Sequence, residues 1–144
     1  MYDFSSHYSY KDNFVIFVKQ SFLRYVSRQK VVQHMDFSNQ LESSAISLLV
    51  NITSRFNCGS DFTYNHISST IAPISDFSIW NTNVSYRLLP ANNLEVSFSA
   101  FDLLRQNKGV INRGISNMLT TGTVNMLQQY YMVKLAFYPR KFGS

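Results

Sequence analysis

Apolar and polar residues alternate along several stretches of the chain, most clearly in its second half. From Tyr130 to Tyr138 and in three earlier stretches, alternate positions carry large apolar side chains, while many of the positions between them carry Ser, Asn or a charge. A period of two places successive side chains on opposite faces of a β-strand. The pattern therefore predicts strands with one apolar face. The apolar positions are Ile46, Leu48, Val50 and Ile52; Trp80, Thr82, Val84, Tyr86 and Leu88; Leu94, Val96, Phe98 and Ala100; and Tyr131, Val133, Leu135 and Phe137.

The first 42 residues fit two patterns. Val15, Val18 and Phe22 fit a helical stripe, whereas Phe14, Ile16 and Val18 fit a strand. The β-branched and aromatic content favours the strand. We therefore predict about seven strands: Tyr2–Tyr10, Asn13–Val26, Ser43–Ser54, Cys58–His66, Phe77–Leu88, Asn93–Leu103 and Leu127–Tyr138.

Short and long connections alternate between the predicted strands. Residues 55–57 and 89–93 form short turns, whereas Ile67–Ser75 and Leu104–Asn125 are longer and rich in Ser, Thr and Asn. Transmembrane barrels show this asymmetry between tight periplasmic turns and longer outer loops. We expect an all-β, antiparallel up-and-down transmembrane β-barrel, complete or partial, with residues 1–144 as one domain and its clearest periodicity over 43–144.

Alternation alone does not separate a barrel from a soluble β-sandwich. The polar face carries Asn, Ser, Gln and isolated charges such as Arg87, Glu95 and Lys134, which suits a polar lumen. We also expect aromatic girdles near the strand ends, formed by Phe77, Trp80, Tyr130, Tyr131 and Tyr138. The residues expected to face lipid are Trp80, Val84, Tyr86, Leu94, Val96, Phe98, Tyr131, Val133, Leu135 and Phe137.

Composition narrows the class of protein. The chain is 45% hydrophobic and 15% charged, which is too apolar for a disordered chain. Its net charge of +5 comes from singly scattered Lys and Arg, a distribution that argues against nucleic acid as a partner. No apolar run approaches the length of a membrane-spanning helix. Cys58 is the only cysteine, so it forms no internal disulfide, and we interpret it as a small filler on a strand.

Three sequence boxes occur in order near the end of the chain: Phe101–Lys108 (FDLLRQNK), Asn125–Met132 (NMLQQYYM) and Tyr138–Gly143 (YPRKFG). This arrangement is very similar to the C-terminal signature of Bacteroidetes-type outer-membrane β-barrel proteins, a family akin to TonB-dependent receptors. It departs from that signature at Arg105, at Pro139 and in the additional Ser144. Because proline cannot donate to a strand ladder, Tyr138 is expected to be the last regularly paired residue.

The resemblance implies a location in the bacterial outer membrane and a part in nutrient uptake by a receptor or transporter. The implied partners are outer-membrane lipid, the barrel-insertion machinery, which would recognise Tyr138 and Phe142, and other subunits or the rest of the barrel. The odd strand count and the absence of a secretory signal at Met1 favour the closing part of a larger barrel. The alternatives are a soluble β-sandwich binding or adhesion module and a small structural barrel.

We find no pattern that predicts catalysis, a metal site or a cofactor. His7, His34 and His66 lack ligand spacing, and we expect each of them in a loop or at a rim. We interpret Asp102 as an acid at a strand end that accepts hydrogen bonds from Asn107 or from backbone amides. Two Asn-X-Ser/Thr triplets, beginning at Asn51 and Asn83, fall in predicted strands. We therefore expect that the protein is not an enzyme.

Overall fold

The chain forms antiparallel β-structure, with no helix among the residues that the computed structural model describes. These are residues 2–11, 13–29, 35–70, 74–89, 93–107, 110–115, 118–123 and 127–139. The strands are β1 (Tyr2–Tyr10), β2 (Phe14–Gln29), β3 (Met35–Asn51), β4 (Phe56–Ser69), β5 (Ser75–Leu88), β6 (Leu94–Phe101), β7 (Val110–Ile115), β8 (Met118–Thr123) and β9 (Tyr130–Phe137).

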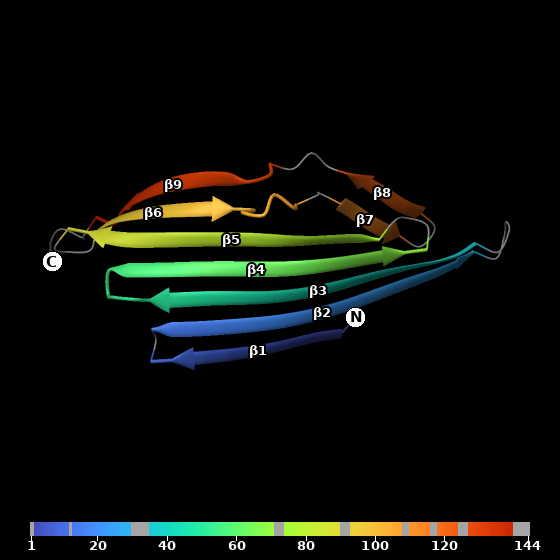
Figure 1. Cartoon of the computed structure of the whole chain (residues 1–144), viewed down its shortest axis with the longest axis horizontal. Helices are drawn as coiled ribbons and strands as arrows, with labels where there is room; N and C mark the ends of the chain where they lie inside the picture. The colour runs from blue at the N-terminus through green and yellow to red at the C-terminus, as the bar shows by residue number, and fades with distance from the viewer. Residues whose placement is uncertain are drawn as a thin grey trace.

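Seven strands lie side by side in one sheet, in the order β1-β2-β3-β4-β5-β6-β9 (Figure 1). Every neighbouring pair is antiparallel. The strands therefore follow the up-and-down order that the sequence predicts. The sheet is open, with β1 and β9 at its two edges. The hairpin of β7 and β8 forms a separate two-stranded sheet.

The structure confirms a seven-stranded antiparallel sheet and corrects several boundaries. Residues 14–29 form β2, so the helical interpretation of this region is wrong. The strand predicted from Ser43 begins at Met35 instead, because the ladder with β2 continues to the pair Gln29 and Met35. The predicted loop Ile67–Ser75 is shorter than expected, since β4 continues to Ser69 and β5 begins at Ser75.

The predicted loop Leu104–Asn125 contains a hairpin that the sequence analysis missed. Strands β7 and β8 pair from Val110 with Thr123 to Ile115 with Met118. Each strand is only six residues long and contains a glycine, so neither shows the sustained alternation by which the longer strands were recognised.

The described residues contain almost no hydrophobic core. Ala100 is the only hydrophobic residue in them that is buried, and Ser85 and Asp102 are buried polar residues. A sheet with one apolar face normally buries that face against another layer. The described part of this chain has a single main sheet, and its large apolar side chains remain exposed or half-buried.

Candidate functional site

Strand register sorts the side chains of the main sheet onto two chemically different faces. Paired residues on neighbouring strands share a face, and the next residue along each strand lies on the other. One line of paired residues crosses all seven strands. It contains no charged residue, no amide and no serine or threonine. We call the face that carries this line the apolar face. The line runs through Tyr10, Phe14, Val50, Cys58, Val84, Phe98 and Val133.

The opposite surface, which we call the polar face, has a different composition at the neighbouring register position. Five strands contribute one residue each to a line of paired residues that consists of two amides, two hydroxyls and a cation at its end. Its members are Asn51, Asn57, Ser85, Ser97 and Lys134.

All ten residues predicted to face lipid lie on the apolar face. Each is in register with another apolar-face residue, for example Tyr86 with Val96 and Val96 with Leu135. Leu135 is 70% exposed and Val133 is 67% exposed, while Leu94 and Val96 are half-buried between neighbouring strands. The predicted alternation is therefore confirmed, whereas contact with lipid stays a prediction.

The apolar face gives way to polar residues toward the ends of β2–β5 that join to the loops at 30–34 and 70–74. One register line there contains Gln20, Ser44, Tyr64 and Ser78. The following line pairs Glu42 with His66 and His66 with Asp76. The apolar surface is thus a band with a defined limit.

Aromatic residues lie at this limit. Phe62 pairs with Trp80, and the indole Nε1 of Trp80 donates a hydrogen bond to Ser60 Oγ at 2.9 Å. Tyr131 also lies on the apolar face, where its ring stacks on Phe98 with the ring centroids 6.0 Å apart. Trp80 and Tyr131 therefore occupy the apolar face, as the girdle prediction requires.

Phe77 and Tyr130, which were also predicted to belong to the girdles, lie on the polar face. Phe77 pairs with Asn65, and Tyr130 pairs with Phe101. The prediction is wrong for these two residues because nearness to a strand end does not determine the face. Their position in the period of two does so.

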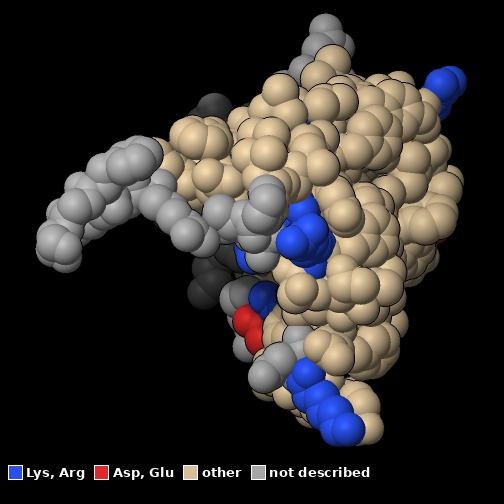
Figure 2. All heavy atoms as spheres, turned by 90° about the vertical axis from the view of Figure 1, so that its left-hand side faces the viewer, with Lys and Arg blue, Asp and Glu red and all other residues tan. Residues whose placement is uncertain are grey.

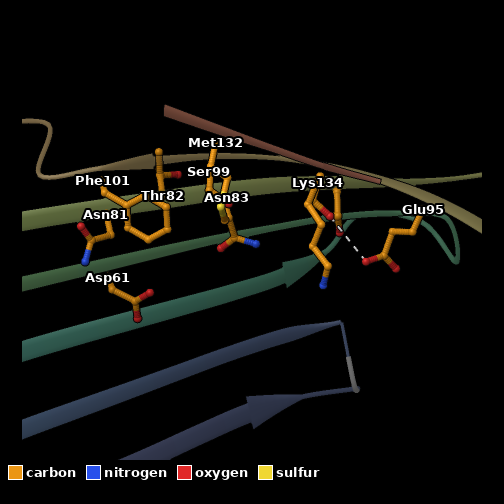
Figure 3. A pocket seen from close by; sticks show the side chains of 11 residues that line it. Asp61, Asn81, Thr82, Asn83, Glu95, Ser99, Phe101, Met132 and Lys134 are labelled. Atoms are coloured by element: carbon orange, nitrogen blue, oxygen red, sulfur yellow. Dashed lines mark hydrogen bonds between the residues drawn. The ribbon is translucent and has the colours of Figure 1, made fainter. Parts of the chain in front are cut away.

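The polar face is hollowed beside β5 and β6. The hollow measures about 390 Å³, and Figure 3 shows Asp61, Asn83 and Lys134 among the side chains around it. In the end-on view of Figure 2, several charged side chains lie on the hollowed left side, while the right side carries few. The lining residues are Asp61, Asn81, Thr82, Asn83, Ser85, Glu95, Ser97, Ser99, Phe101, Met132 and Lys134.

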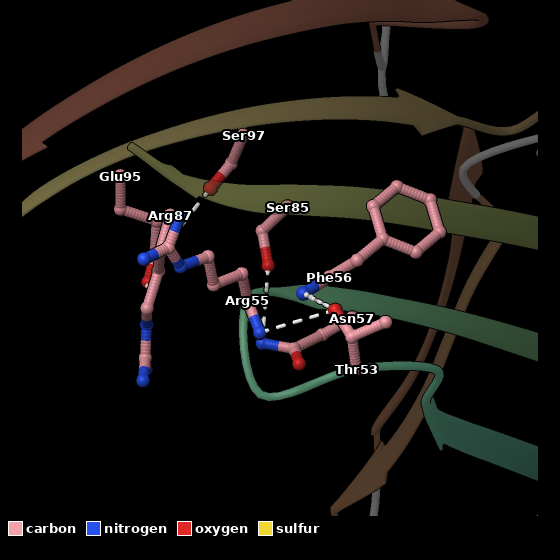
Figure 4. Close-up of polar contacts among 8 residues, drawn as sticks. All are labelled: Thr53, Arg55, Phe56, Asn57, Ser85, Arg87, Glu95 and Ser97. Carbon is pink, nitrogen blue, oxygen red and sulfur yellow. Dashed lines mark hydrogen bonds and ion pairs between the residues drawn. The ribbon is translucent and has the colours of Figure 1, made fainter. Parts of the chain in front are cut away.

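Polar contacts connect β4, β5 and β6 on this face near the tight turns (Figure 4). Arg87 Nε donates to Glu95 Oε2 at 3.1 Å, forming an ion pair between β5 and β6. Asn57 Nδ2 donates to Ser85 Oγ at 3.5 Å. These contacts link polar side chains of three strands into a surface suited to water rather than lipid.

The turn at 52–55 is closed by its own backbone and by one hydroxyl. The backbone N–H of Ile52 donates to the Phe56 carbonyl at 2.9 Å. Thr53 Oγ1 accepts hydrogen bonds from the N–H groups of Arg55 at 3.2 Å and Phe56 at 3.0 Å. A side-chain acceptor of this kind defines a tight, stable connection between β3 and β4.

Asp102 organises the segment that follows β6. Its Oδ1 accepts the N–H of Gln106 and its Oδ2 accepts the N–H of Asn107, each at 3.1 Å. The residue is 3% exposed and has a φ of 48°, a left-handed conformation that is uncommon outside Gly, Asn and Asp. The predicted structural role of Asp102 as an acceptor for backbone amides is confirmed.

The first two sequence boxes meet in space around Asp102. The rings of Phe101 and Tyr130 stack with their centroids 4.6 Å apart. Arg105 Nε donates to Gln129 Oε1 at 2.5 Å, and Gln129 Nε2 donates to the Leu103 carbonyl at 3.2 Å. The segment after β6 is thereby held against the start of β9.

This segment is also held against β5. The N–H of Asp102 donates to Asn81 Oδ1 at 3.0 Å, and the N–H of Leu103 donates to the Trp80 carbonyl at 2.9 Å. A second hollow of about 400 Å³ lies here, lined by Ile79, Asn81, Phe101, Asp102, Asn107, Leu127 and Tyr130.

The residues considered for metal binding or redox chemistry do not gather into a site. No group of three or more His, Cys, Asp or Glu able to hold a metal ion occurs in the described part of the chain. His66 Nδ1 lies 2.5 Å from Asp76 Oδ1. Cys58 is half-buried on β4, as expected for a filler on a strand.

The histidines were predicted to lie in loops or at a rim, and the structure does not place them all there. His7 lies within β1, and His66 lies within β4 near its end, so the loop prediction is wrong for His7. Both residues fall within strands that the alternation predicted, Tyr2–Tyr10 and Cys58–His66. His34 lies outside the described residues.

The predicted end of the last strand is nearly correct. Strand β9 ends at Phe137, and the N–H of Tyr138 still donates to the Asn93 carbonyl at 2.7 Å. Phe142 lies outside the described residues, and the insertion-signal role of Tyr138 and Phe142 stays a prediction. Of the two Asn-X-Ser/Thr triplets, the one at Asn83 lies within β5, whereas Asn51 is the last residue of β3.

Among the described residues, no helix has the length and apolar character needed to cross a membrane. Comparisons with protein-family models, with curated proteins and with solved structures found no match.

Proposed function

We propose that this chain forms part of the wall of an outer-membrane β-barrel, with its apolar face toward lipid and its polar face toward the lumen. The observation that carries this proposal is the apolar line across all seven strands of a sheet, with no second layer over it in the described residues. In lipid, such a face needs no covering layer.

The extent of the apolar face supports this assignment. Seven strands have six spacings of about 4.8 Å, which makes the sheet about 29 Å wide. From Trp80 to Leu88 the face extends over eight residue steps of about 3.3 Å, or about 26 Å. The product, about 750 Å², exceeds the apolar patch of roughly 300–600 Å² on a typical soluble monomer.

Strand length supports it as well. The segment from Trp80 to Leu88 contains nine residues, within the range of about 9–11 that a tilted strand needs to cross the hydrocarbon layer. The band ends in aromatic residues and then in hydrogen-bonded polar residues, as expected where a barrel wall passes from hydrocarbon to the interface.

The connections indicate an orientation. The links at 11–13, 52–55 and 89–93 lie at one end of the sheet. The links at 30–34 and 70–74 lie at the other end, together with residues 102–129, which join β6 to β9. We assign the end that has only short links to the periplasm and the end with the long connection to the outside, following the asymmetry of known barrels.

The transport part of the proposal comes from the sequence resemblance. Proteins with this C-terminal signature act in nutrient uptake across the outer membrane, and we propose the same role for the protein to which this wall segment belongs. The polar hollow and the long connection from β6 to β9 would then face the transported ligand.

Gel migration after extraction in mild detergent tests the barrel assignment. We expect the protein to sediment with outer membranes and to change its electrophoretic mobility on boiling, because a closed barrel resists SDS until it is heated. A protein that is soluble without detergent and migrates identically before and after boiling would instead indicate a soluble β-sandwich.

A further inference from the structure

The polar hollow beside β5 and β6 carries two charged side chains that lack a partner. Asp61 on β4 and Lys134 on β9 both line the hollow, and both are exposed. Neither side chain has a hydrogen bond or an ion pair within the described part of the chain. Glu95, the third charged residue of the lining, is paired with Arg87. The hollow therefore presents one free carboxylate and one free ammonium group.

These two charges lie at opposite ends of the hollow (Figure 3). The register line through Asp61 meets β9 at Tyr130, which is four residues before Lys134. Strands β4 and β9 are separated by β5 and β6, which makes three strand spacings. At about 4.8 Å for each spacing and about 3.3 Å for each residue along a strand, the two Cα atoms are about 20 Å apart.

Neutral hydrogen-bonding groups lie between the two charges. Asn83 on β5 pairs with Ser99 on β6, and both line the hollow in its middle (Figure 3). Neither side chain has a hydrogen-bond partner among the described residues. An amide and a hydroxyl can each donate and accept a hydrogen bond. The hollow thus presents a carboxylate, then neutral donors and acceptors, then an ammonium group.

The second hollow adjoins the first at its Asp61 end. Asn81 and Phe101 line both hollows, and Asn81 is in register with Asp61. The rest of the second lining includes the apolar side chains of Ile79 and Leu127. An apolar group can therefore enter the second hollow from the end of the first that carries the free carboxylate.

We propose that the two hollows bind a short, extended peptide with free termini. Its terminal ammonium group pairs with Asp61, its terminal carboxylate pairs with Lys134, and its backbone amides bond to Asn83 and Ser99. The apolar side chain of its first residue occupies the second hollow. Four to six extended residues span about 13–22 Å, which matches the separation of the two charges. This inference rests on the proposed function, because it names the class of ligand that the lumen admits.

Other classes of ligand match the hollow less well. A neutral oligosaccharide would displace water from Asp61 and Lys134 and leave both charges without a partner, which costs free energy. A polyanion would meet a single free cation and would be repelled by Asp61. A short peptide carries opposite charges at its two ends and neutral amides between them, in the same arrangement as the complementary groups of the hollow.

Calorimetric titration of the full-length protein, extracted from outer membranes in mild detergent, tests this assignment. The probe is the peptide Leu-Ser-Gly-Ser-Gly with free termini, compared with its N-acetylated form, its C-amidated form and maltohexaose. We expect the free peptide to bind and each blocked form to bind about tenfold more weakly, because each has lost one charged hydrogen-bonding group. Maltohexaose is expected to bind more weakly than any of the peptides.

Two substitutions connect each charge of the peptide to one residue. Asp61→Asn should weaken binding of the free peptide about tenfold and leave the affinity for the N-acetylated peptide unchanged. Lys134→Gln should do the same for the free and the C-amidated peptide. The matched controls are Asp3→Asn and Lys19→Gln, which remove exposed charges of the polar face outside the hollow and should change none of these affinities.

Three results would overturn the inference: no heat of binding from the free peptide at millimolar concentration, equal affinity for the free and blocked peptides, or tighter binding of maltohexaose. An equal loss of affinity for the free and N-acetylated peptides in Asp61→Asn would also overturn it. Heat-modifiable migration of the same preparation tests the proposed function separately. A protein that enters membranes but fails the peptide tests contradicts the ligand class alone, whereas a protein that never enters membranes contradicts the proposed function.

Discussion

Placing a cation at the middle of the apolar face tests whether this face lies against lipid or against water. Val133 is 67% exposed and lies in the line of paired residues that crosses all seven strands. We expect Val133→Arg to reduce the free energy of unfolding by about 2–4 kcal/mol, the cost of a cation on the lipid face of a barrel near the bilayer midplane. On a sheet in water, an exposed substitution of this kind costs about 0.5 kcal/mol or less.

Met132→Arg is the matched control because Met132 is the preceding residue on β9 and is also exposed. Its side chain lies on the polar face beside Ser99 and lines the hollow, so we expect a change of about 0.5 kcal/mol or less. Both substitutions introduce the same side chain into the same edge strand. The difference between their effects on the free energy of unfolding therefore reports how the environments of the two faces differ.

Urea titration of isolated membranes, followed by protease digestion, measures the two free energies. A difference of about 2–4 kcal/mol corresponds to a ratio of roughly 30 to 700 between the two equilibrium constants, at about 1.4 kcal/mol for each factor of ten. Equal, small effects of Val133→Arg and Met132→Arg would refute the assignment of the apolar face to lipid.

Two further substitutions test the polar face. Asp102→Ala removes the acceptor of two backbone N–H groups, so we expect the free energy of unfolding to fall by about 1–3 kcal/mol and amide exchange at Gln106 and Asn107 to become faster. Asp61→Ala is the control and should leave this exchange unchanged. Unaltered exchange in Asp102→Ala would contradict the role of this carboxylate. A Cβ at Gly59 would lie 2.4 Å from Asn83 Oδ1, so we expect Gly59→Ala to lower the free energy of unfolding by about 1 kcal/mol, and Asn83→Ala to remove this loss in the double variant. Denaturant titration measures both effects. An equal loss in the double variant would show that the contact with Asn83 is not its cause.

The alternation in the sequence was sufficient to predict the antiparallel sheet and the faces of its strands. Val84, Phe98 and Val133 were predicted to share a face from the period of two, and the register places them in one line. The prediction succeeded here because backbone geometry alone determines which face a strand residue occupies.

Other features depend on contacts that the local pattern does not contain. The early start of β3 at Met35 and the later end of β4 at Ser69 follow from pairing with neighbouring strands. Asp61 was not predicted to belong to the polar hollow, because the order Gly59, Ser60, Asp61 has no apolar alternation. Only the register of β4 with β5 places Asp61 beside Asn81.

The contacts between the first two sequence boxes at the end of the chain were not predicted. Phe101 and Tyr130 are separated by 28 intervening residues that include the hairpin of β7 and β8. Their stacking and the bond from Arg105 to Gln129 arise because β6 and β9 are neighbours in the sheet. Sequence periodicity carries no signal for a contact over that distance.

The most direct test of the central claim measures which face of the sheet touches lipid. Trp80 is the only tryptophan of the chain, so a Trp80→Phe background allows one new tryptophan to be placed at Val133→Trp on the apolar face or at Met132→Trp on the polar face. Quenching of tryptophan fluorescence by brominated lipid acyl chains then reports contact with hydrocarbon. We predict strong quenching for Val133→Trp and weak quenching for Met132→Trp. Equal quenching of the two, or quenching of neither, would contradict a lipid-facing apolar surface.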